Sequence, residues 1–378
     1  MRSCGIIVEY NPFHNGHCYH AEMARKLSGA DVVIAVMSGN FLQRGEPAIM
    51  DKWMRAEAAL HNGVDLVVEL PFSWAVQSAD YFAKGGIKLL QALNCDALCF
   101  GTDSQETINY QEYGQLFFEK EAEINRLFHQ LPIGMSYPEK MAEVVRQVFP
   151  TIQEFPPNHI LGLSYAKENA KYPKPMEIYP LTRKDQGYHD AEMVKEQFAS
   201  ATGIRKAFMS GQEIKSFVPS ETSEQLEKAI SWDNFWSYLN YQVTVSTPKE
   251  MLNIYQMNEG IEHRLKNSQG ENFADYLLKV KTKRYTGTRL QRLLTYFLLQ
   301  IRPEEIEKEQ DQSMLHVLGF TKQGQEYLSQ NKKEFTLPLA AKMGQMEKER
   351  HFLTYRADQL YQLVHPIEQN IGRIPIRV

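Results

Sequence analysis

Three regularly spaced histidines follow the first apolar run of the sequence, and they are the side chains best suited to chemistry. His14, His17 and His20 come shortly after Gly5–Val8, a run typical of a buried strand. Residues 14–17 form an HxGH element at the expected start of a helix, where unpaired N–H groups and the helix dipole favour phosphate. Imidazoles at this place can donate hydrogen bonds to phosphate oxygens and stabilise the charge that develops when pyrophosphate leaves.

Two other interpretations of these histidines stay open. They could cap the helix or lie on its surface without binding a ligand. They could also bind zinc, but histidines at i, i+3 and i+6 without a carboxylate or thiol at suitable spacing make a poor zinc site. We therefore expect no metal site that is built by the protein itself.

A second candidate phosphate element lies much later in the chain. Ser200, Thr202 and Arg205 form an SxTxIR pattern in which the hydroxyl side chains are good caps for a helix that begins near Thr202. We expect these three residues to contact the β and γ phosphates of a nucleotide. An HxGH element after the first strand, paired with a late SxTxIR element, is typical of nucleotidyltransferase-like α/β proteins.

The elements that must position these residues alternate along the first half of the chain. Helical patterns at His17–Leu27, Trp53–His61 and Ala75–Leu93 separate four apolar runs of strand length, which are Gly5–Val8, Asp31–Met37, Asp65–Leu70 and Ala97–Phe100. This alternation is typical of βαβ units, so we expect an α/β fold with a Rossmann-like parallel sheet. Ligands of such sheets bind beyond the carboxyl ends of the strands, where the HxGH element lies.

The rest of the chain predicts a helical insertion and a second domain. Residues 105–150 have a helical pattern, after which a helix from Asn158 to Lys167 and a strand at Met176–Leu181 resume the α/β pattern. Beyond about Gly211 strand patterns fade. We expect a nucleotidyltransferase-like domain at 1–215 and a mainly helical domain at 216–378.

Composition is that of an ordinary globular protein. The chain has 378 residues, of which 43% are hydrophobic and 23% charged, with a formal net charge of −4. This charge excludes a generally basic nucleic-acid coat but not a local basic patch. No apolar run of membrane-spanning length and no signal peptide is visible. The four cysteines include no CxxC pair, and we expect reduced thiols in a cytoplasmic protein.

Several segments taken together narrow the function. They are EYNPFHNGH, MSGNFLQRGEPA, DKWMRAEAAL, GVDLVVELPF, CFGTD, NHILGLSYAK, TRKDQGYHD, SATGIRKA, KVKTKRYTGTRLQRLL and LGFTKQGQEYL. With these segments the chain resembles the bacterial tRNA(Met) cytidine acetate ligase family over essentially its whole length. The resemblance implies that ATP, with Mg²⁺, and acetate form acetyl-adenylate, which then acetylates N4 of the wobble cytidine in elongator tRNA(Met).

The resemblance also implies site residues. His14 and His17 are the expected catalytic residues, and 1–215 is the expected domain for ATP and acetate activation. The expected ATP-binding residues are Ile7, Val8, Glu9, Tyr10, Asn11, Pro12, Phe13, His14, Asn15, Gly16, His17, Cys18, Tyr19, His20, Gly101, Asn158, Arg183, Ser200, Thr202 and Arg205. For Asn158, a plain helix cap is the alternative.

The strongest basic stretch lies in the second domain. Between His263 and Leu293 there are eight Lys and Arg residues against two acidic ones, with Tyr285 inside the stretch and Tyr296 beyond it. Such residues suit an RNA backbone with nearby base stacking, although a solvated helix face is the alternative. The expected tRNA-binding residues are Lys279, Lys281, Lys283, Arg284, Arg289 and Arg292.

The sequence leaves alternative roles open for three further residues and one loop. Residues 38–45 follow a strand and are expected to face a ligand, with a simple crossover turn as the alternative. Lys52 and Arg55 are expected to face the triphosphate or solvent, and Glu69 needs a buried ion pair or a catalytic role. Two other functions also remain: a small-molecule nucleotidyltransferase of the HxGH class and a non-catalytic RNA-binding protein.

Overall fold

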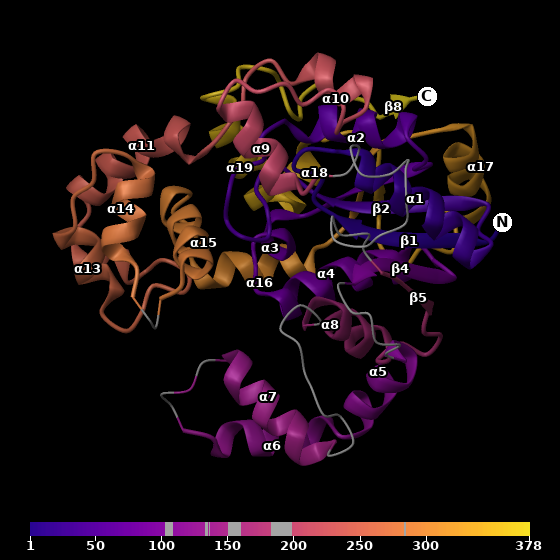
Figure 1. The fold of residues 1–378 in the computed structure, drawn as a ribbon, viewed down its shortest axis with the longest axis horizontal. Helices are drawn as coiled ribbons and strands as arrows, with labels where there is room; N and C mark the ends of the chain where they lie inside the picture. Colours follow the sequence, from indigo (N-terminus) through magenta and orange to yellow (C-terminus); the bar gives the residue numbers. More distant parts are fainter. Residues whose placement is uncertain (103–108, 133–134, 136, 150–159, 183–198, 283–284) are drawn as a thin grey trace.

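The structure is a computed structural model that describes residues 1–102, 109–132, 135, 137–149, 160–182, 199–282 and 285–378. Its centre is a single sheet flanked by helices, with two helical groups extending away from it (Figure 1). In the described part of the chain no helix is long and apolar enough to cross a membrane.

Five parallel strands of the sheet come from the first half of the chain. They are ordered β5-β4-β1-β2-β3. Their bounds are β1 Ser3–Val8, β2 Val32–Ser38, β3 Leu66–Leu70, β4 Ala97–Thr102 and β5 Glu177–Thr182. This order places β1 at the centre of the sheet, and it confirms the predicted Rossmann-like core.

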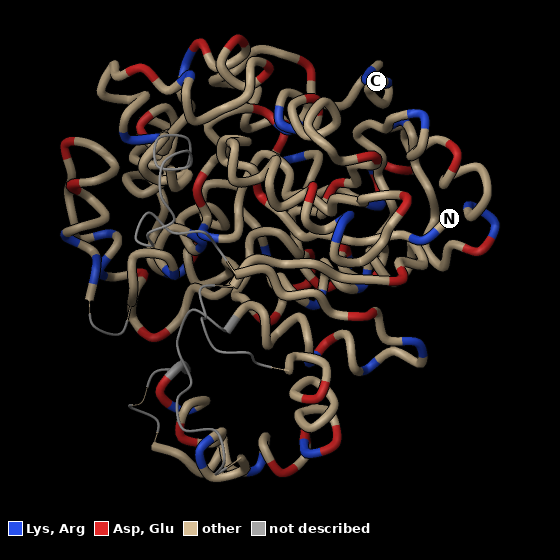
Figure 2. Tube along the Cα trace, turned by 45° about the vertical axis from the view of Figure 1, so that its right-hand side comes forward, with Lys and Arg blue, Asp and Glu red and all other residues tan. Residues whose placement is uncertain are grey.

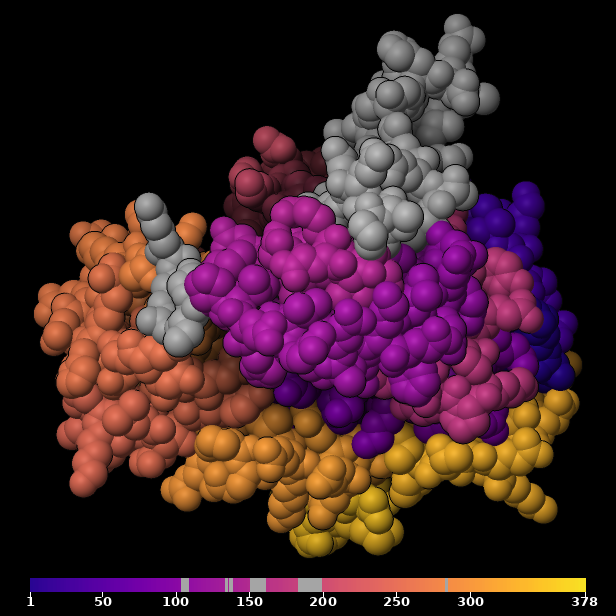
Figure 3. All heavy atoms as spheres, turned by 90° about the horizontal axis from the view of Figure 1, so that it is seen from below, coloured from indigo at the N-terminus to yellow at the C-terminus, as the bar shows by residue number. Residues whose placement is uncertain are grey.

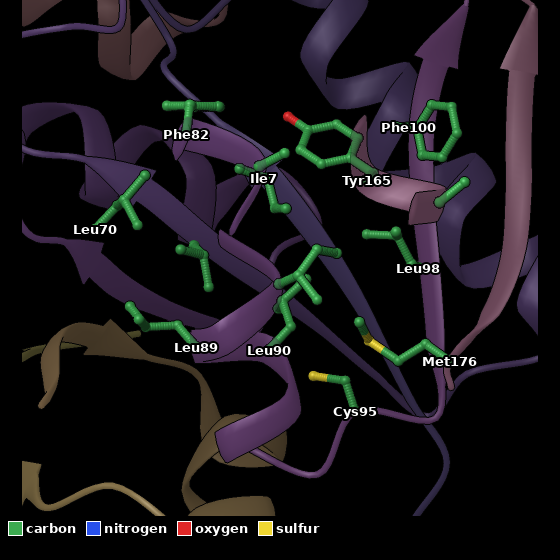
Figure 4. Packing of buried hydrophobic residues seen from close by; sticks show 14 of the residues in the cluster. Ile7, Leu70, Phe82, Leu89, Leu90, Cys95, Leu98, Phe100, Tyr165 and Met176 are labelled. Carbon is green, nitrogen blue, oxygen red and sulfur yellow. The ribbon is translucent and has the colours of Figure 1, made fainter. Parts of the chain in front are cut away.

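Helices cover both faces of this sheet because alternate strand residues point to opposite sides. On one side Ile7 and Leu98 pack against Phe82 and Leu90 of α4 (Ala79–Ala92) and Tyr165 of α8 (Ile160–Asn169) (Figure 4). On the other side the strands pack against α1 (Asn15–Ser28) and α2 (Lys52–His61). The helix expected at Ala75–Leu93 is α4, which begins later, at Ala79, because Ala75 ends a separate short helix, α3 (Phe72–Ala75).

The predicted helical insertion is present. It contains α5 (Tyr110–Glu119), α6 (Glu121–Gln130) and α7 (Tyr137–Val148). Buried side chains of α5, α6 and α7 belong to the same hydrophobic core as α4 and α8. Figure 3 shows the insertion as a broad magenta surface on the lower side of the molecule.

The second half of the chain is mainly helical, as expected. Two helices, α9 (Ala201–Met209) and α10 (Ser220–Gln225), pass over the first half. A group of helices then packs around a second hydrophobic core, to which Phe41, Phe72 and Val76 of the first half also contribute. We call this group the helical unit, and it comprises α11 Trp232–Val245, α12 Pro248–Met251, α13 Ile261–Asn267, α14 Phe273–Val280 and α15 Gly287–Leu298. The remaining helices are α16 Pro303–Asp311, α17 Lys322–Asn331, α18 Gln345–Arg350 and α19 Phe352–Gln362.

The sheet does not end with the first half of the chain, which corrects the expectation of an all-parallel sheet. Strand β6 (Leu315–Phe320) pairs with β3 in the antiparallel direction, and β7 (Leu339–Ala340) and β8 (Ile376–Arg377) pair with β6. The short apolar run of β6 is buried beside β3 and covers an edge that would otherwise be open. The boundary near residue 215 stays a prediction, but residues 315–320 share the sheet of the first half.

Candidate active site

The HxGH histidines are held in defined orientations at the start of α1. His14 is the N-cap, and its Nδ1 accepts a hydrogen bond from the Gly16 N–H at 3.0 Å. The Nδ1 atom of His17 accepts one from the His14 N–H at 3.2 Å, and the two rings stack with centroids 3.7 Å apart. A neutral imidazole that accepts at Nδ1 carries its proton on Nε2. Both rings therefore present an Nε2–H donor, so capping and phosphate binding are compatible.

Two aromatic side chains of the preceding loop pack against the ring of His17. The ring centroid of Tyr10 lies 4.8 Å from that of His17, and the centroid of Phe13 lies 5.6 Å away. Both aromatic rings are buried, as are the side chains of Ile7 and Val8 in β1. These four residues can therefore offer a nucleotide little more than their backbone groups, which is consistent with a close approach to the loop.

The structure brings the second predicted phosphate element to this loop. Ser200 caps α9 by accepting the Gly203 N–H at 3.1 Å, which matches the predicted helix start. Arg205 donates to the Asn11 carbonyl oxygen at 2.7 Å and lies 3.5 Å from Glu46. Its guanidinium also donates to Thr202 Oγ1 at 3.3 Å. The SxTxIR element thus lies beside the loop that leads into the HxGH element.

The segment after α9 fixes the other side of the same loop. The Asn15 backbone N–H donates to the Phe217 carbonyl, and the Asn15 amide donates to the Ser216 carbonyl. Thr222 Oγ1 donates to the Phe13 carbonyl at 3.1 Å. Residues just beyond the predicted boundary at 215 therefore help to shape the N-terminal site.

The other expected ATP-binding residues are placed as follows. Gly101 lies in β4 and is half-buried. Tyr19 and His20 are half-buried in the first turns of α1. Burial raises the pKa of the Cys18 thiol to about 11, so Cys18 is a neutral thiol rather than a nucleophile. Asn158 and Arg183 lie outside the described residues.

Comparisons with known proteins bear on the whole chain. Residues 1–373 match the HIGH Nucleotidyl Transferase family model. Proteins named tRNA(Met) cytidine acetate ligase from Ligilactobacillus salivarius and Streptococcus thermophilus are 40% and 42% identical, and each alignment covers 100% of both chains. The chain belongs to the tRNA(Met) cytidine acetate ligase family.

Solved structures agree with this family assignment. Thermotoga maritima TmcAL in its apo form has a TM-score of 0.88 and 30% sequence identity, with both chains covered completely. The same protein bound with alpha-thio ATP has a TM-score of 0.86 at the same identity and coverage. The fold of the acetate ligase family is therefore shared over the full length of this chain.

In this member of the acetate ligase family, the segment at residues 38–49 is hydrogen-bonded to the loop that leads into the HxGH element. The Gln43 N–H donates to Glu9 Oε1 at 2.6 Å, and the Ile49 N–H donates to Asn11 Oδ1 at 2.8 Å. Arg55 is fully buried beneath this loop. Its guanidinium donates to the backbone carbonyls of Glu9, Ser38, Gly39 and Met50.

The expectation that Arg55 faces triphosphate or solvent is therefore wrong. Every guanidinium nitrogen already donates to a backbone carbonyl, so Arg55 organises the loop from inside.

The same expectation is wrong for Lys52. Its ammonium is fully buried and donates to Glu69 at 2.8 and 3.0 Å and to Asp358 of α19 at 2.6 Å. Glu69 also contacts His316 of β6 at 2.6 Å, so the buried ion pair expected as one alternative for Glu69 is confirmed. We call Lys52, Glu69, His316 and Asp358 the ionic cluster. Its last two members come from the far end of the chain and carry no sequence signal of this role.

The basic stretch of the helical unit is only partly exposed. Lys279 and Lys281 are exposed, whereas Arg289 is half-buried with its guanidinium 4.4 Å from the centroid of the Tyr285 ring. Arg292 points inward, and its Nη1 lies 3.5 Å from the Gln43 carbonyl oxygen. Lys283 and Arg284 lie outside the described residues. Positive and negative positions alternate over the rest of the chain (Figure 2).

The two tyrosines of this region are not exposed stacking surfaces, which corrects their expected use. Tyr285 is buried and donates to the Asn258 carbonyl at 2.8 Å. Tyr296 is fully buried and donates to the Val76 carbonyl at 2.5 Å. Both rings belong to the core of the helical unit: Tyr296 lies on a buried face of α15, and Tyr285 lies in the short segment before that helix.

Proposed function

We propose that this chain is an ATP-dependent ligase that forms N4-acetylcytidine at the wobble position of elongator tRNA(Met) through an acetyl-adenylate intermediate. The observation that carries the proposal is the convergence of His14, His17 and Arg205 on one loop at the carboxyl edge of the central strand. Relatives named for this activity cover the full chain at 40% and 42% identity, which supports the same conclusion.

The first half-reaction requires charge stabilisation more than covalent chemistry by the protein. Acetate attacks the α-phosphorus of ATP, the bond to the bridging oxygen breaks, and pyrophosphate leaves with the electron pair. The Nε2–H donors of His14 and His17 would bind phosphate oxygens as negative charge accumulates on them. The guanidinium of Arg205, held beside Thr202, would contact the departing phosphates.

We propose that Mg²⁺ enters with ATP, since phosphate oxygens are hard ligands that this ion prefers. Within the described residues, no group of three or more His, Cys, Asp or Glu side chains is placed to hold a metal ion. The protein's own residues would therefore act on the phosphates directly.

We propose that tRNA is bound by the basic stretch of the helical unit. Exposed Lys279 and Lys281, together with Lys283, Arg284 and Arg289, would contact phosphates of the anticodon arm. An anticodon loop presents unstacked bases that a protein can draw into a site, whereas a duplex does not. Its substrates, tRNA and ATP, place the proposed reaction in the cytoplasm.

The decisive experiment incubates the protein with ATP, labelled acetate and candidate RNAs. Acetate-dependent exchange of pyrophosphate into ATP, followed by label on tRNA, is the expected result. Label on a small phosphorylated acceptor instead would favour a small-molecule nucleotidyltransferase. RNA binding without any exchange would leave a non-catalytic RNA-binding protein.

Two substitutions at His17 test the role of its imidazole. His17→Ala removes both the transition-state donor and the cap, and exchange is expected to fall about 10²–10³-fold while tRNA binding stays nearly intact. His17→Gln keeps an acceptor for the His14 N–H, as in a capping box, so it separates capping from catalysis. His61→Ala, at an exposed position on α2, is the control. Near-normal exchange in His17→Ala would remove this residue from the catalytic assignment.

A further inference from the structure

Glu9 is a carboxylate placed at the edge of the sheet with one oxygen fixed and one left available. It is the first residue after β1 and is half-buried. Its Oε1 accepts the Gln43 N–H at 2.6 Å. Among the described residues no side chain or backbone group donates to its Oε2. A carboxylate oriented in this way can accept a proton from a ligand without breaking its own support.

Glu9 also lies where the two halves of the protein meet. The loop that donates to it contacts α15, because Thr295 Oγ1 donates to the Gly45 carbonyl at 2.7 Å. A Cβ added to Gly45 would lie 2.3 Å from the Arg292 backbone nitrogen, so the loop and α15 touch through their backbones. Glu9 is thus hydrogen-bonded to the same loop that contacts α15 of the helical unit.

This junction is where the two substrates have to meet. The nucleotide is assigned to the end of β1, the loop that follows it and the HxGH element, a segment that includes Glu9. The RNA is assigned to the helical unit, whose α15 includes Arg289 near its start and Thr295, which contacts the loop. The reacting cytidine must reach across from one to the other, and Glu9 is the carboxylate on the strand that ends there.

The charges around Glu9 favour a basic carboxylate. Burial raises its pKa above the ordinary value, the Gln43 N–H opposes this rise, and Glu46 adds to it. Arg44 and Arg55 lower the pKa by smaller amounts. A carboxylate whose pKa is raised toward the working pH is a more effective general base.

We propose that Glu9 is the general base that accepts the N4 proton of cytidine during acetyl transfer. The proposal rests on the proposed function. N4 attacks the acetyl carbonyl carbon, a C–N bond forms, and the carbonyl electron pair moves to oxygen. The pair then returns, the bond between the acetyl carbon and the AMP oxygen breaks, and AMP leaves with that pair. The N4 proton passes to the Glu9 carboxylate, from which water later removes it.

Glu9→Gln is the sharpest test because it keeps a carbonyl oxygen to accept the Gln43 N–H and removes only the ability to take a proton. Because Glu9 lies in the segment expected to bind ATP, acetate-dependent ATP–pyrophosphate exchange is measured beside transfer, and it is expected to fall far less than transfer does. Single-turnover transfer from preformed acetyl-adenylate to tRNA is expected to fall about 10²–10⁴-fold. The rise of the native transfer rate with pH on its acidic side is expected to disappear.

Glu57→Gln is the matched control, because Glu57 is another half-buried carboxylate of the first half, and it accepts a hydrogen bond from Gln225. Both half-reactions should be unchanged in it. Native-like transfer by Glu9→Gln would overturn the role of Glu9 while leaving the proposed function intact. A fall in exchange as large as the fall in transfer would leave Glu9 a role in ATP binding alone and overturn the proposal. Absence of acetate-dependent exchange in the native protein would instead overturn the proposed function itself.

Discussion

Replacing Lys52 by methionine should destabilise the protein strongly, although the two side chains are similar in length. The Lys52 ammonium donates three hydrogen bonds of 2.6–3.0 Å to Glu69 and Asp358, and all three side chains are at most 1% exposed. Removing it leaves two carboxylates buried without their cation. Burial by itself opposes the charged form of Lys52, but attraction to these carboxylates raises its pKa, so the ammonium is charged.

The expected loss of unfolding free energy comes from the two uncompensated carboxylates rather than from lost packing. Breaking a buried ion pair by removing one partner costs about 3–5 kcal/mol, because the remaining charge has no compensation. A typical folded domain is stable by only about 5–15 kcal/mol. The variant should therefore lose about a fifth of its stability or more, whereas methionine fills most of the volume and adds little cavity cost.

The assay is equilibrium urea unfolding at pH 8, followed by tryptophan fluorescence and analysed for the midpoint at constant slope. Lys279→Met is the control, since Lys279 pairs with Asp275 at 2.8 Å on an exposed helix face. Such an exposed pair contributes about 0.2–1 kcal/mol. Combining Lys52→Met with Glu69→Gln and Asp358→Asn should recover part of the loss, because it neutralises the carboxylates left behind.

A loss for Lys52→Met no larger than that of the control would refute the reasoning. It would mean that the carboxylates of the ionic cluster take up protons or water at little cost when the cation is removed. Failure of the triple variant to recover stability would refute a narrower point, namely that uncompensated charge rather than shape accounts for the loss.

Two further predictions concern pH and RNA. Burial raises the pKa of Asp358 from 3.8 to about 7, so the folded chain keeps a proton that the unfolded chain releases in this range. Its contribution to stability is full below pH 3.8 and is lost as pH rises through about 7; Asp358→Asn should flatten the unfolding free energy measured across this window. Reversing the charge of Lys281, Lys283, Arg284 and Arg289 to Glu should weaken tRNA binding steeply and lower its salt slope by roughly one per lost phosphate contact, while ATP–pyrophosphate exchange continues.

A charge reversal on another surface is the control for the effect on tRNA binding. Charge reversal at Lys322, Lys332 and Lys333, which are exposed on or next to α17, adds a similar negative charge elsewhere. It should change tRNA affinity much less. An unchanged salt slope in the quadruple variant would make the basic stretch an ordinary solvated surface, and loss of exchange in a folded variant would assign it to the ATP site.

Local signals in the sequence were sufficient for the elements that carry the chemistry. The alternation of apolar runs and amphipathic segments predicts β1 to β4 and their helices, because buried parallel strands need continuous apolar residues. The start of α1 at Asn15 and the cap at Ser200 could be read from residue types, since capping involves neighbours only a few positions apart. The HxGH element therefore lies where the sequence predicts it, at the end of β1.

Only the tertiary structure decided which distant residues lie together. Asp358 reaches Lys52 across 306 positions of sequence, and β6 joins the edge of β3 from the far end of the chain. Tyr285 lies in a basic stretch that favours RNA stacking, yet its ring is buried, because the direction of an aromatic ring depends on how the surrounding elements pack. Such contacts depend on the packing of whole elements, and no periodicity within one segment specifies its partner in another.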